Sequence, residues 1–434
     1  MTNISTEIPK QNLFTAIDSL LDDRSLFLTN PNSDFTRVKK IPFRQTILFP
    51  MTAGSDNTAT ELIDAFNEKD IPLPSAMIQR RNRVKPEAFQ ALFHRFTDTI
   101  PIQNTLKGHQ VVACDGSRAN LPYNPSDPDT FIQCIKGRKG INQIHLNCLY
   151  DVLNDLFLDT VLQPFHQMDE QGAFYSMLDR QKSGDLKQKR IYLADRGYAS
   201  YNIFAHAINN GQLFLIRVAE SFAKSLCGND PFWQDVEFDQ MKRIQIGRRR
   251  TKNLLQTKDY HFIPKRRRYD FIAPGSDEID TLQLRVLKFP LTDNSSEYIV
   301  TNLPQYGFSL QDIKRLYNLR WNQETAYRHL KYAGNMVHIH SRKREFLLQE
   351  IYGKLTLYNF SAFLAMCVGK VQKATGKYIY VLNHTQVQKI CIRFLRGIIK
   401  DPIPLICKYL VPVRPGRKFP RNLRSQTADT LTYR

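Results

Sequence analysis

The sequence lacks the features that mark disulfide-stabilised, zinc-binding and membrane-spanning proteins. Its seven cysteines are an odd number, and no two of them form a Cys-x2-Cys pair, which argues against a disulfide scaffold and against a zinc ribbon. No uninterrupted apolar run reaches about 18 residues, and the first residues, Met1-Thr2-Asn3-Ile4, show no signal-peptide pattern. We therefore expect a protein of the reducing cytoplasm that has no membrane partner.

The segment from Phe346 to Val368 comes nearest to a membrane span, because most of its side chains are apolar. It nevertheless contains Glu350, Lys354, Asn359 and Ser361. Charged side chains near the centre of a membrane span are costly. The pattern therefore predicts a helix that packs inside the protein.

Acidic residues are scarce relative to basic ones. The chain has 61 lysines and arginines against 41 aspartates and glutamates, a net charge of +20 and a pI of about 9.6. Such an excess of positive charge favours a polyanionic partner and salt-dependent binding. With 434 residues, the chain is long enough for a large core and two or three domains.

Two of the scarce carboxylates follow short apolar runs. Asp115 comes after Val111 to Cys114, and Asp195 comes after Ile191 to Ala194; a glycine follows each aspartate within two residues. A buried strand that ends in an aspartate and a turn carries that carboxylate to the edge of a sheet. For either motif alone, an ordinary strand-to-helix turn, with Asp195 capping the next helix, is the better explanation.

A third carboxylate lies in the segment Leu316 to Tyr332, which no glycine or proline interrupts and which therefore predicts a helix. At 3.6 residues per turn, four of its residues lie on or near one face: Tyr317, Arg320, Glu324 and Lys331. A solvated, salt-bridged face is the alternative, and the helix alone does not decide. Together with two strand-end aspartates, Glu324 completes a set that can hold two Mg²⁺ ions roughly 3.5–4 Å apart.

These motifs resemble a known family. Asp-Gly-Ser at 115–117, Ala-Asp-Arg-Gly-Tyr at 194–198 and the Tyr/Arg/Glu/Lys helix are similar to the three signature regions of the DDE transposases of bacterial insertion sequences. The most similar group is family four, the cut-and-paste enzymes. The resemblance runs from about residue 34 to about residue 360, and the spacing of the three carboxylates is that of the family.

The resemblance implies a mechanism and its partners. Asp115, Asp195 and Glu324 would be the catalytic residues and would hold two Mg²⁺ ions, for which Mn²⁺ can substitute, while Tyr317, Arg320 and Lys331 would bind terminal phosphates. Water would nick the end of the element, and the freed 3′ hydroxyl would attack phosphodiesters, with a hairpin at the excised end. The implied partners are the terminal inverted repeats and target DNA, both double-stranded, bound by a homodimer at the nucleoid of a bacterial cytoplasm.

Two alternatives stay open at this point. One is a DNA nuclease of the same fold that performs no strand transfer. The other is a DNA-binding regulator, descended from a transposase, that has lost catalysis. The complete set of three carboxylates argues against the regulator.

The order of apolar segments predicts an α/β fold. From about Gln110, three antiparallel strands are followed by helix, strand, helix and strand, which is the ribonuclease H-like order. The second and third strands should form a hairpin around Asn154-Asp155, the fourth strand should cover 190–194, and the helix after it 201–209. The first and fourth strands are neighbours in that order, so Asp115 and Asp195 should meet. Residues 269–273 are one of the strands expected further along the chain. Asp151 and Asp159 alternate with apolar residues and should face solvent. The expected domains are a helical DNA-recognition domain (1–105), the catalytic core (106–220 and 303–372), a β-rich insertion (221–302) and a helical C-terminal region with a basic tail (373–434).

Clusters of basic residues are the expected DNA contacts. A helix that begins near Ser75 resembles a helix-turn-helix reader, although a solvated helix bundle would look similar. Two basic runs in the expected insertion lie beside a nuclease-like site, which favours DNA contacts over solvated loops. The residues concerned are Arg80, Arg81, Arg83 and Lys85 in the helix region, and Arg248, Arg249, Arg250, Arg266, Arg267 and Arg268 in the runs. The tail, 413–434, reads as a basic arm for DNA or a second protomer.

Overall fold

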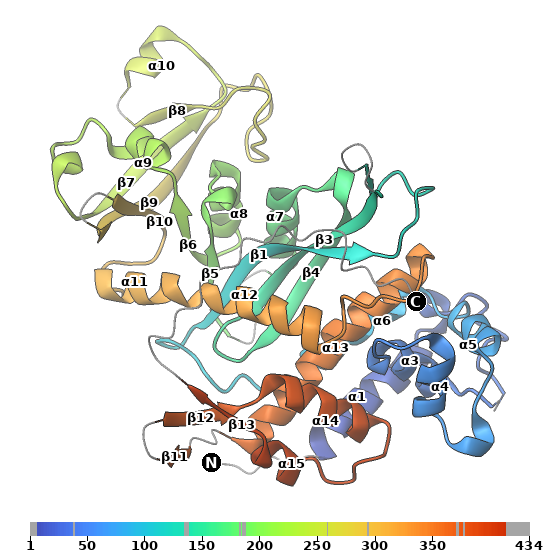
Figure 1. Ribbon diagram of the computed structural model, residues 1–434. Coiled ribbons are helices and arrows are strands. Elements are labelled where there is room, and N and C mark those ends of the chain that lie inside the picture. Colours follow the sequence, from blue (N-terminus) through green and yellow to red (C-terminus); the bar gives the residue numbers. More distant parts are fainter. Residues whose placement is uncertain are drawn as a thin grey trace.

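The structure is a computed structural model that describes residues 7–37, 40–133, 139–181, 184, 188–257, 259–292, 295–369, 373–375 and 378–413. One large mixed sheet runs through the molecule, with helices packed on it and a helical region beside it (Figure 1). The predicted α/β class is therefore confirmed. The basic tail lies outside the described residues from position 414 onward.

The central part of the sheet contains the strands that present the signature aspartates. The strand predicted to end at Asp115 continues to Leu121, because it goes on pairing with its neighbour, so that predicted end is wrong; the strand before Asp195 ends at Ala194 as predicted. Its strands are β1 (Gln110–Leu121), β3 (Ile141–Asp151), β4 (Leu156–Pro164), β5 (Arg190–Ala194) and β6 (Leu213–Val218). β3 pairs antiparallel with both β1 and β4, whereas β5 pairs parallel with β1 and with β6. The short strand β2 (Phe131–Ile132) pairs with the start of β3. The predicted adjacency of the first and fourth long strands is confirmed.

The predicted hairpin between β3 and β4 is also confirmed, and Asp155 in its turn adopts a positive φ of 57°. The prediction that Asp151 and Asp159 face solvent is wrong, because both are buried. Asp151 accepts hydrogen bonds from Gln110 and from the backbone of Asn154, and Asp159 accepts them from Arg180. These partners satisfy the carboxylates inside the protein, which the alternation of side chains along a strand does not reveal.

The sheet continues past β6 in the order β10 (Ser295–Thr301), β9 (Ile279–Thr292), β7 (Phe238–Gly247) and β8 (Tyr260–Phe262). The strands expected in the β-rich insertion thus extend the central sheet. A strand predicted over residues 269–273 is wrong, since these residues belong to the β8–β9 loop, residues 263–278. Four backbone carbonyls of that loop accept hydrogen bonds from the Arg248 side chain instead of from a neighbouring strand.

Helices cover both faces of the central strands. α7 (Glu170–Arg180) packs on β3 and β4, and α8 (Tyr201–Asn209) packs on β6. α12 (Trp321–Arg328), which follows α11 (Leu310–Leu319), packs on β1. Two further helices, α9 (Glu220–Cys227) and α10 (Lys252–Gln256), accompany the outer strands.

The N-terminal region is helical, as predicted, and surrounds the long helix α13 (Arg344–Val368), which contacts α3, α6 and α14. By length and composition α13 could span a membrane, but 72% of its apolar window is buried inside the protein. It is the packed helix that the sequence predicts. The other elements of this region are α1 (Glu7–Asp18), α2 (Arg24–Phe27), α3 (Phe43–Thr52), α4 (Thr58–Ala65), α5 (Pro74–Arg81), α6 (Pro86–Thr97), α14 (His384–Leu395), α15 (Ile403–Lys408) and a small sheet of β11 (Lys373–Thr375), β12 (Tyr378–Leu382) and β13 (Leu410–Val413).

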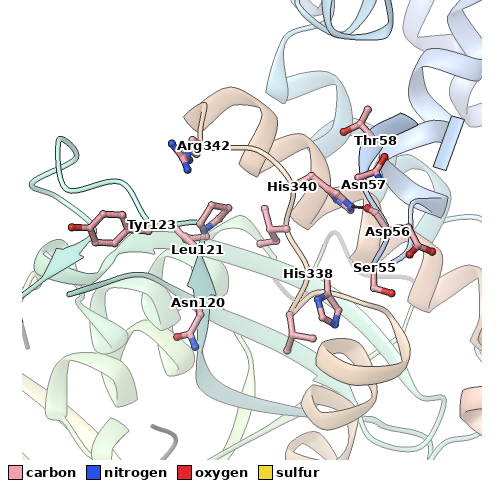
Figure 2. A pocket seen from close by; sticks show the side chains of 13 residues that line it. Ser55, Asp56, Asn57, Thr58, Asn120, Leu121, Tyr123, His338, His340 and Arg342 are labelled. Carbon is pink, nitrogen blue, oxygen red and sulfur yellow. Dashed lines mark hydrogen bonds between the residues drawn. The ribbon is translucent and has the colours of Figure 1, made fainter. Parts of the chain in front are cut away.

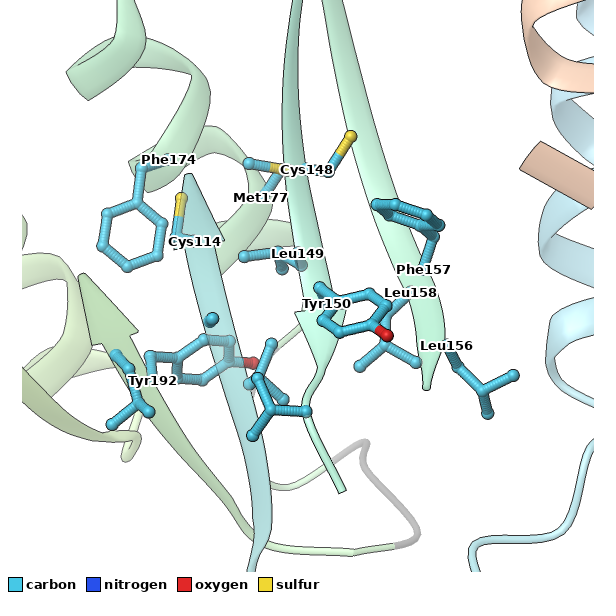
Figure 3. Packing of buried hydrophobic residues seen from close by; sticks show 14 of the residues in the cluster. Cys114, Cys148, Leu149, Tyr150, Leu156, Phe157, Leu158, Phe174, Met177 and Tyr192 are labelled. Atoms are coloured by element: carbon cyan, nitrogen blue, oxygen red, sulfur yellow. The ribbon is translucent and has the colours of Figure 1, made fainter. Parts of the chain in front are cut away.

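Apolar side chains pack on both faces of the central sheet. Cys114, Leu149, Phe174 and Tyr192 pack between the strands and α7 (Figure 3), and each has no exposed surface. Phe157 is also fully buried, but it lies on the opposite face, where its ring packs against Tyr327 and Tyr358 at 5.8 and 4.8 Å between centroids. Strands buried on both faces read as unbroken apolar runs, which explains the sequences before Asp115 and Asp195. Close packing leaves the ends of these strands little freedom to move.

Candidate active site

Asp115 and Asp195 lie at adjacent positions of neighbouring strands. The parallel register pairs Cys114 with Ala194, so the next residue on each strand is an aspartate. Asp115 Oδ1 accepts a hydrogen bond from the Gly116 N–H at 2.9 Å, and Asp195 Oδ1 accepts one from the Gly197 N–H at 2.8 Å. Asp195 therefore also caps the short turn that follows it, as the alternative interpretation of its motif expected.

Glu324 reaches the same region from α12. The helix predicted over 316–332 is present, but it is divided at Arg320 into α11 and α12 and ends in a π-helical turn, His329–Ala333. Arg320 Nη1 lies 3.7 Å from Asp115 Oδ2, and Arg320 Nη2 lies 3.9 Å from Glu324 Oε1. The guanidinium thus connects the carboxylate on β1 with the carboxylate on α12.

The electrostatics of Asp115 reflect this grouping. The pKa of the Asp115 carboxyl is raised to about 6: burial is the main cause, the negative charges of Asp195 and Glu324 add to the rise, and the Gly116 N–H and Arg320 oppose it. Like charges within a few ångströms disfavour the ionised form. The three predicted carboxylates therefore influence one another in the folded protein.

The three carboxylates are neighbours without being an assembled metal site. Among the described residues, no three His, Cys, Asp or Glu side chains are grouped closely enough to ligate one ion. Arg320, whose side chain is 7% exposed, lies against two of the carboxylates. The role of these residues as metal ligands stays a prediction.

Two residues of α12 that the sequence analysis did not assign hold the helix on the sheet. The Tyr327 hydroxyl donates to the Asp115 backbone carbonyl at 2.7 Å, and Gln323 Nε2 donates to the Cys148 carbonyl at 2.9 Å. Both side chains are buried. Tyr327 lies on the same helical face as Arg320 and Glu324, and this spacing was the available signal for its role.

The signature residues Tyr317, Arg320 and Lys331 differ in their surroundings. Tyr317 is buried, with its ring 5.8 Å from the Arg320 guanidinium. Arg320 Nε is also buried, and no described residue accepts a hydrogen bond from it. Burial lowers the pKa of Lys331, which lies in the π turn and so departs from the regular helical face that we predicted.

Gly116 lets α7 approach the strand directly after Asp115. A Cβ atom at this position would lie 2.4 Å from His145 Nε2 and 2.8 Å from Glu170 Oε1, and these two side chains form an ion pair at 3.0 Å. Because successive strand residues point to opposite faces, Asp115 faces α12 and position 116 faces α7. Gln171, the next residue of α7, donates to the Gly197 carbonyl at 2.8 Å, so the start of α7 lies against β1 next to Asp115 and contacts the turn that follows Asp195.

The residues predicted to read a DNA end are used largely within the protein. Arg81 is 6% exposed and bonds to Gln349 at 3.0 Å and to Glu350 at 3.2 Å. Arg80 is 7% exposed and donates to the Ile41 carbonyl. These bonds explain both arginines without DNA, so we do not carry them into the proposed interface. More exposed are Arg83, paired with Asp34 at 3.1 Å, and Lys85, which donates to the Ser25 carbonyl.

The two basic runs, which lie in loops beside the outer strands, also contain both structural and exposed arginines. Arg248 donates to the carbonyls of the β8–β9 loop and is therefore a structural residue here. Arg249 forms an ion pair with Asp277. The remaining members of the two runs are exposed, and DNA contact stays a prediction for them: Arg250, Arg266, Arg267 and Arg268.

A pocket of about 290 Å³ lies where the end of β1 meets α4 and the segment 337–342 (Figure 2). His340 contacts the Asp56 carbonyl at 2.7 Å across its rim. Asn120 and Tyr123 line its other side. None of the three signature carboxylates lines this pocket, so we do not assign it to the active site.

The fold and the site define an α/β protein in which Asp115 within β1, Asp195 directly after β5 and Glu324 on α12 lie near one another. Residues 106–360 match the model of the transposase DDE domain, and the chain belongs to that family. Among solved structures, the chain is similar to the piggyBac transposase in a cryo-EM synaptic complex with hairpin DNA, at 10% sequence identity and a TM-score of 0.42; the match covers 96% of this chain and 85% of that one. No curated protein matches the chain.

Proposed function

We propose that this transposase cleaves the ends of its DNA element and joins them to target DNA by the cut-and-paste route of family four. The strand order supports a ribonuclease H-like core, since three antiparallel strands are followed by two parallel ones and β1 lies beside β5. On this proposal the segment between β6 and β10 is the strand-rich insertion. The partners are the terminal repeats and target DNA, bound by a homodimer in a bacterial cytoplasm.

Asp115, Asp195 and Glu324 are the residues that would hold divalent metal. They present only carboxylate oxygens, the donors that Mg²⁺ and Mn²⁺ prefer. When bound, a pair of such ions activates the attacking oxygen and stabilises the leaving oxygen of a phosphodiester. The contacts of Arg320 with Asp115 and Glu324, at 3.7 and 3.9 Å, are long enough to be weak and to yield to a cation.

The chain's own cations would bind the DNA backbone at this site. Arg320 has a buried Nε without an accepting partner among the described residues, and a phosphate oxygen would supply one. An arginine can grip a phosphate through two parallel hydrogen bonds, which a lysine cannot do. Lys331 would add a positive point charge, and the ring of Tyr317, which lies beside the Arg320 guanidinium, would help to hold that side chain in position.

One observation carries the proposal. Arg320 lies against Asp115 and Glu324, while Asp115 also responds to the charge of Asp195. The acidic centre and a phosphate-binding group therefore belong to one site. If Arg320 served only to pair with Asp115 and Glu324, Asp195 would not need to lie near them.

The test replaces each carboxylate in turn with alanine and measures cleavage and strand transfer on DNA that carries the element's terminal repeats. We expect Asp115→Ala, Asp195→Ala and Glu324→Ala each to abolish both reactions while binding to the DNA ends is largely retained, because the ligands serve chemistry rather than affinity. Glu345→Ala removes an exposed carboxylate from the first turn of α13 and should behave as the unmodified protein.

Cleavage that survives in any of the three variants would remove the proposed site. Cleavage without joined products in the unmodified protein would instead identify a nuclease that performs no strand transfer. Binding without either reaction would identify a regulator.

A further inference from the structure

The β8–β9 loop carries a cluster of exposed cations and has a defined shape. Lys265, Arg266, Arg267 and Arg268 are all exposed. Arg248, the residue directly after β7, donates to the loop carbonyls of residues 264, 267, 269 and 272, at 2.9 to 3.3 Å. One guanidinium thus folds the loop around itself, which limits the positions that its cations can take.

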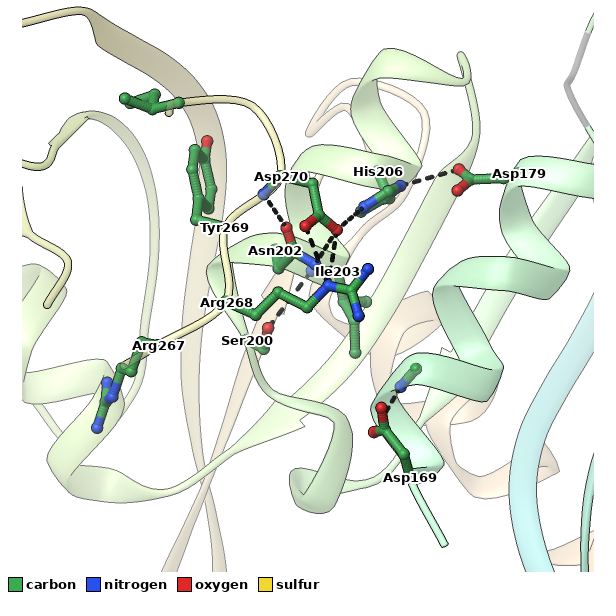
Figure 4. A network of polar contacts seen from close by, with 12 residues as sticks. Asp169, Asp179, Ser200, Asn202, Ile203, His206, Arg267, Arg268, Tyr269 and Asp270 are labelled. Atoms are coloured by element: carbon green, nitrogen blue, oxygen red, sulfur yellow. Dashed lines mark hydrogen bonds and ion pairs between the residues drawn. The ribbon is translucent and has the colours of Figure 1, made fainter. Parts of the chain in front are cut away.

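Asp270 docks this loop on the catalytic part of the chain (Figure 4). Asn202 of α8 donates to Asp270 Oδ2 at 3.0 Å, and the Asp270 N–H donates to Asn202 Oδ1 at 2.8 Å. His206 Nε2, one helical turn further along α8, lies 3.0 Å from the same Oδ2. Arg268 Nε donates to Asp270 as well, at 3.0 Å.

His206 extends the contact to α7. Its Nδ1 lies 2.9 Å from Asp179 Oδ1, and its ring stacks on Tyr175 with 4.9 Å between centroids. Phe271 of the loop packs on the imidazole at 4.8 Å. The imidazole therefore joins α7, α8 and the loop. We refer to Asn202, His206 and Asp270 as the latch.

The docked loop lines a pocket beside the Asp195 turn. The pocket has a volume of about 440 Å³ and lies between the N-terminal turn of α7, the start of α8 and the loop. Its lining includes Ala199 and Ser200, the residues that follow the Asp195 turn, together with Arg267 and Arg268. Arg268 stacks on Tyr175 at 4.4 Å and pairs with Asp270, which leaves Arg267 as the more available cation of the two.

We propose that the latch is a positioning device that holds Arg267 against a phosphate of the DNA strand passing the Asp195 turn. This inference rests on the proposed function, because it assumes that DNA is bound at the carboxylates. On this proposal Asn202, His206 and Asp270 act on the DNA strand through the loop that they hold. Without these three residues, the loop cations keep their charge, but the loop no longer holds them at a fixed position relative to Asp195.

The test uses two variants that disturb the latch without changing the cations. Asn202→Ala removes both hydrogen bonds to Asp270, and His206→Phe keeps an aromatic ring on Tyr175 while removing both polar contacts. We expect faster hydrogen exchange in residues 263–278 in each variant. Single-turnover cleavage of element ends should slow by roughly tenfold to a hundredfold, as misplaced groups do, while the thermal midpoint changes little.

Asp277→Ala is the matched control. It removes an exposed carboxylate from the same loop, where Asp277 pairs only with Arg249 among the contacts that the structure describes. Its exchange and cleavage should equal those of the unmodified protein. The double variant Asn202→Ala with Arg267→Ala should cleave no more slowly than the slower of its two single variants. The two losses should not add, because both residues act through the same contact with DNA.

Three results would overturn the proposal. They are unchanged loop exchange in both latch variants, normal cleavage despite a loosened loop, and additive losses in the double variant. If the unmodified protein cleaves no DNA, the proposed function fails and this inference falls with it. Normal cleavage by the unmodified protein and by both latch variants would refute the latch alone.

Discussion

At the scale of single residues, Asp115 combines two environments that oppose each other. Its carboxyl is largely withdrawn from water and stands near Asp195 and Glu324, which together raise its pKa to about 6. Arg320 and the Gly116 N–H favour the ionised form but do not restore the ordinary value. A carboxylate with this balance ionises fully only near neutral pH or when a cation binds beside it.

The pH dependence of metal binding follows from this pKa. The ionised carboxylate is the metal ligand, so Mg²⁺ affinity should be constant above about pH 7 and should fall as the pH drops through about 6, where Asp115 takes up a proton. Glu324→Gln should move this midpoint downward, because it removes a neighbouring negative charge. Calorimetric titration in buffers of different ionisation heats measures both the affinity and the released protons; a flat affinity from about pH 5 to about pH 8 would contradict the prediction.

At the scale of elements, α12 is held against the sheet by polar contacts to backbone atoms. Tyr327 bonds to the Asp115 carbonyl and Gln323 to the Cys148 carbonyl. These bonds fix Glu324 relative to β1, although the helix is divided at Arg320 and changes to a π turn at His329. A π turn within a helix is often associated with a functional site.

Tyr327→Phe should therefore affect cleavage more than stability. The loss of one buried hydrogen bond costs about 1 kcal/mol in the free energy of unfolding, whereas a shift of α12 displaces Glu324. Tyr358→Phe is the control, because it removes a tyrosine hydroxyl that bonds to Tyr150 at 3.1 Å in the same core. Urea unfolding should give similar losses for the two variants, and only Tyr327→Phe should slow cleavage of element ends. Equal cleavage rates in the two variants would count against the docking role.

At the scale of the whole molecule, buried ion pairs connect the N-terminal helices with α13 and α14. Arg81 pairs with Glu350 at 3.2 Å, and Arg396 pairs with Glu61 at 3.0 Å. Lys354 is fully enclosed and donates to the Met51 carbonyl at 3.3 Å; burial lowers its pKa to about 8. These contacts make the helical region one packed body around α13.

Arg81→Ala should destabilise the fold by about 3 kcal/mol, because it removes the arginine from a buried ion pair and leaves Glu350 with His340 as its remaining partner. Arg83→Ala should cost less, about 1 kcal/mol, since Arg83 is itself partly exposed and buried Asp34 keeps the Asn30 N–H as a hydrogen-bond donor. Urea unfolding measures both values. If Arg81→Ala kept its stability and lost only binding to the DNA ends, the original prediction of a DNA-reading helix would be restored.

The local sequence predicted those features that depend on neighbours along the chain. Apolar runs that end in Asp115 and Asp195 predicted two buried strands, and Asn154-Asp155 predicted the turn of the hairpin, because periodicity and turn chemistry act over a few residues. The boundaries of β5 and α8 agree with the predicted ranges. The match of residues 106–360 to the transposase DDE domain agrees with the motifs that carry these aspartates and Glu324.

Tertiary structure alone decided which charged residues are exposed. Arg81 and Arg267 both lie in basic runs, yet Arg81 meets Glu350, which is 269 positions away in the sequence, while Arg267 stays at the surface. Asp151 and Asp159 were misjudged for the same reason. The environment of a charge depends on burial and on partners that the fold brings from distant parts of the chain, and these long-range contacts also set the pKa of Asp115 and the position of the latch.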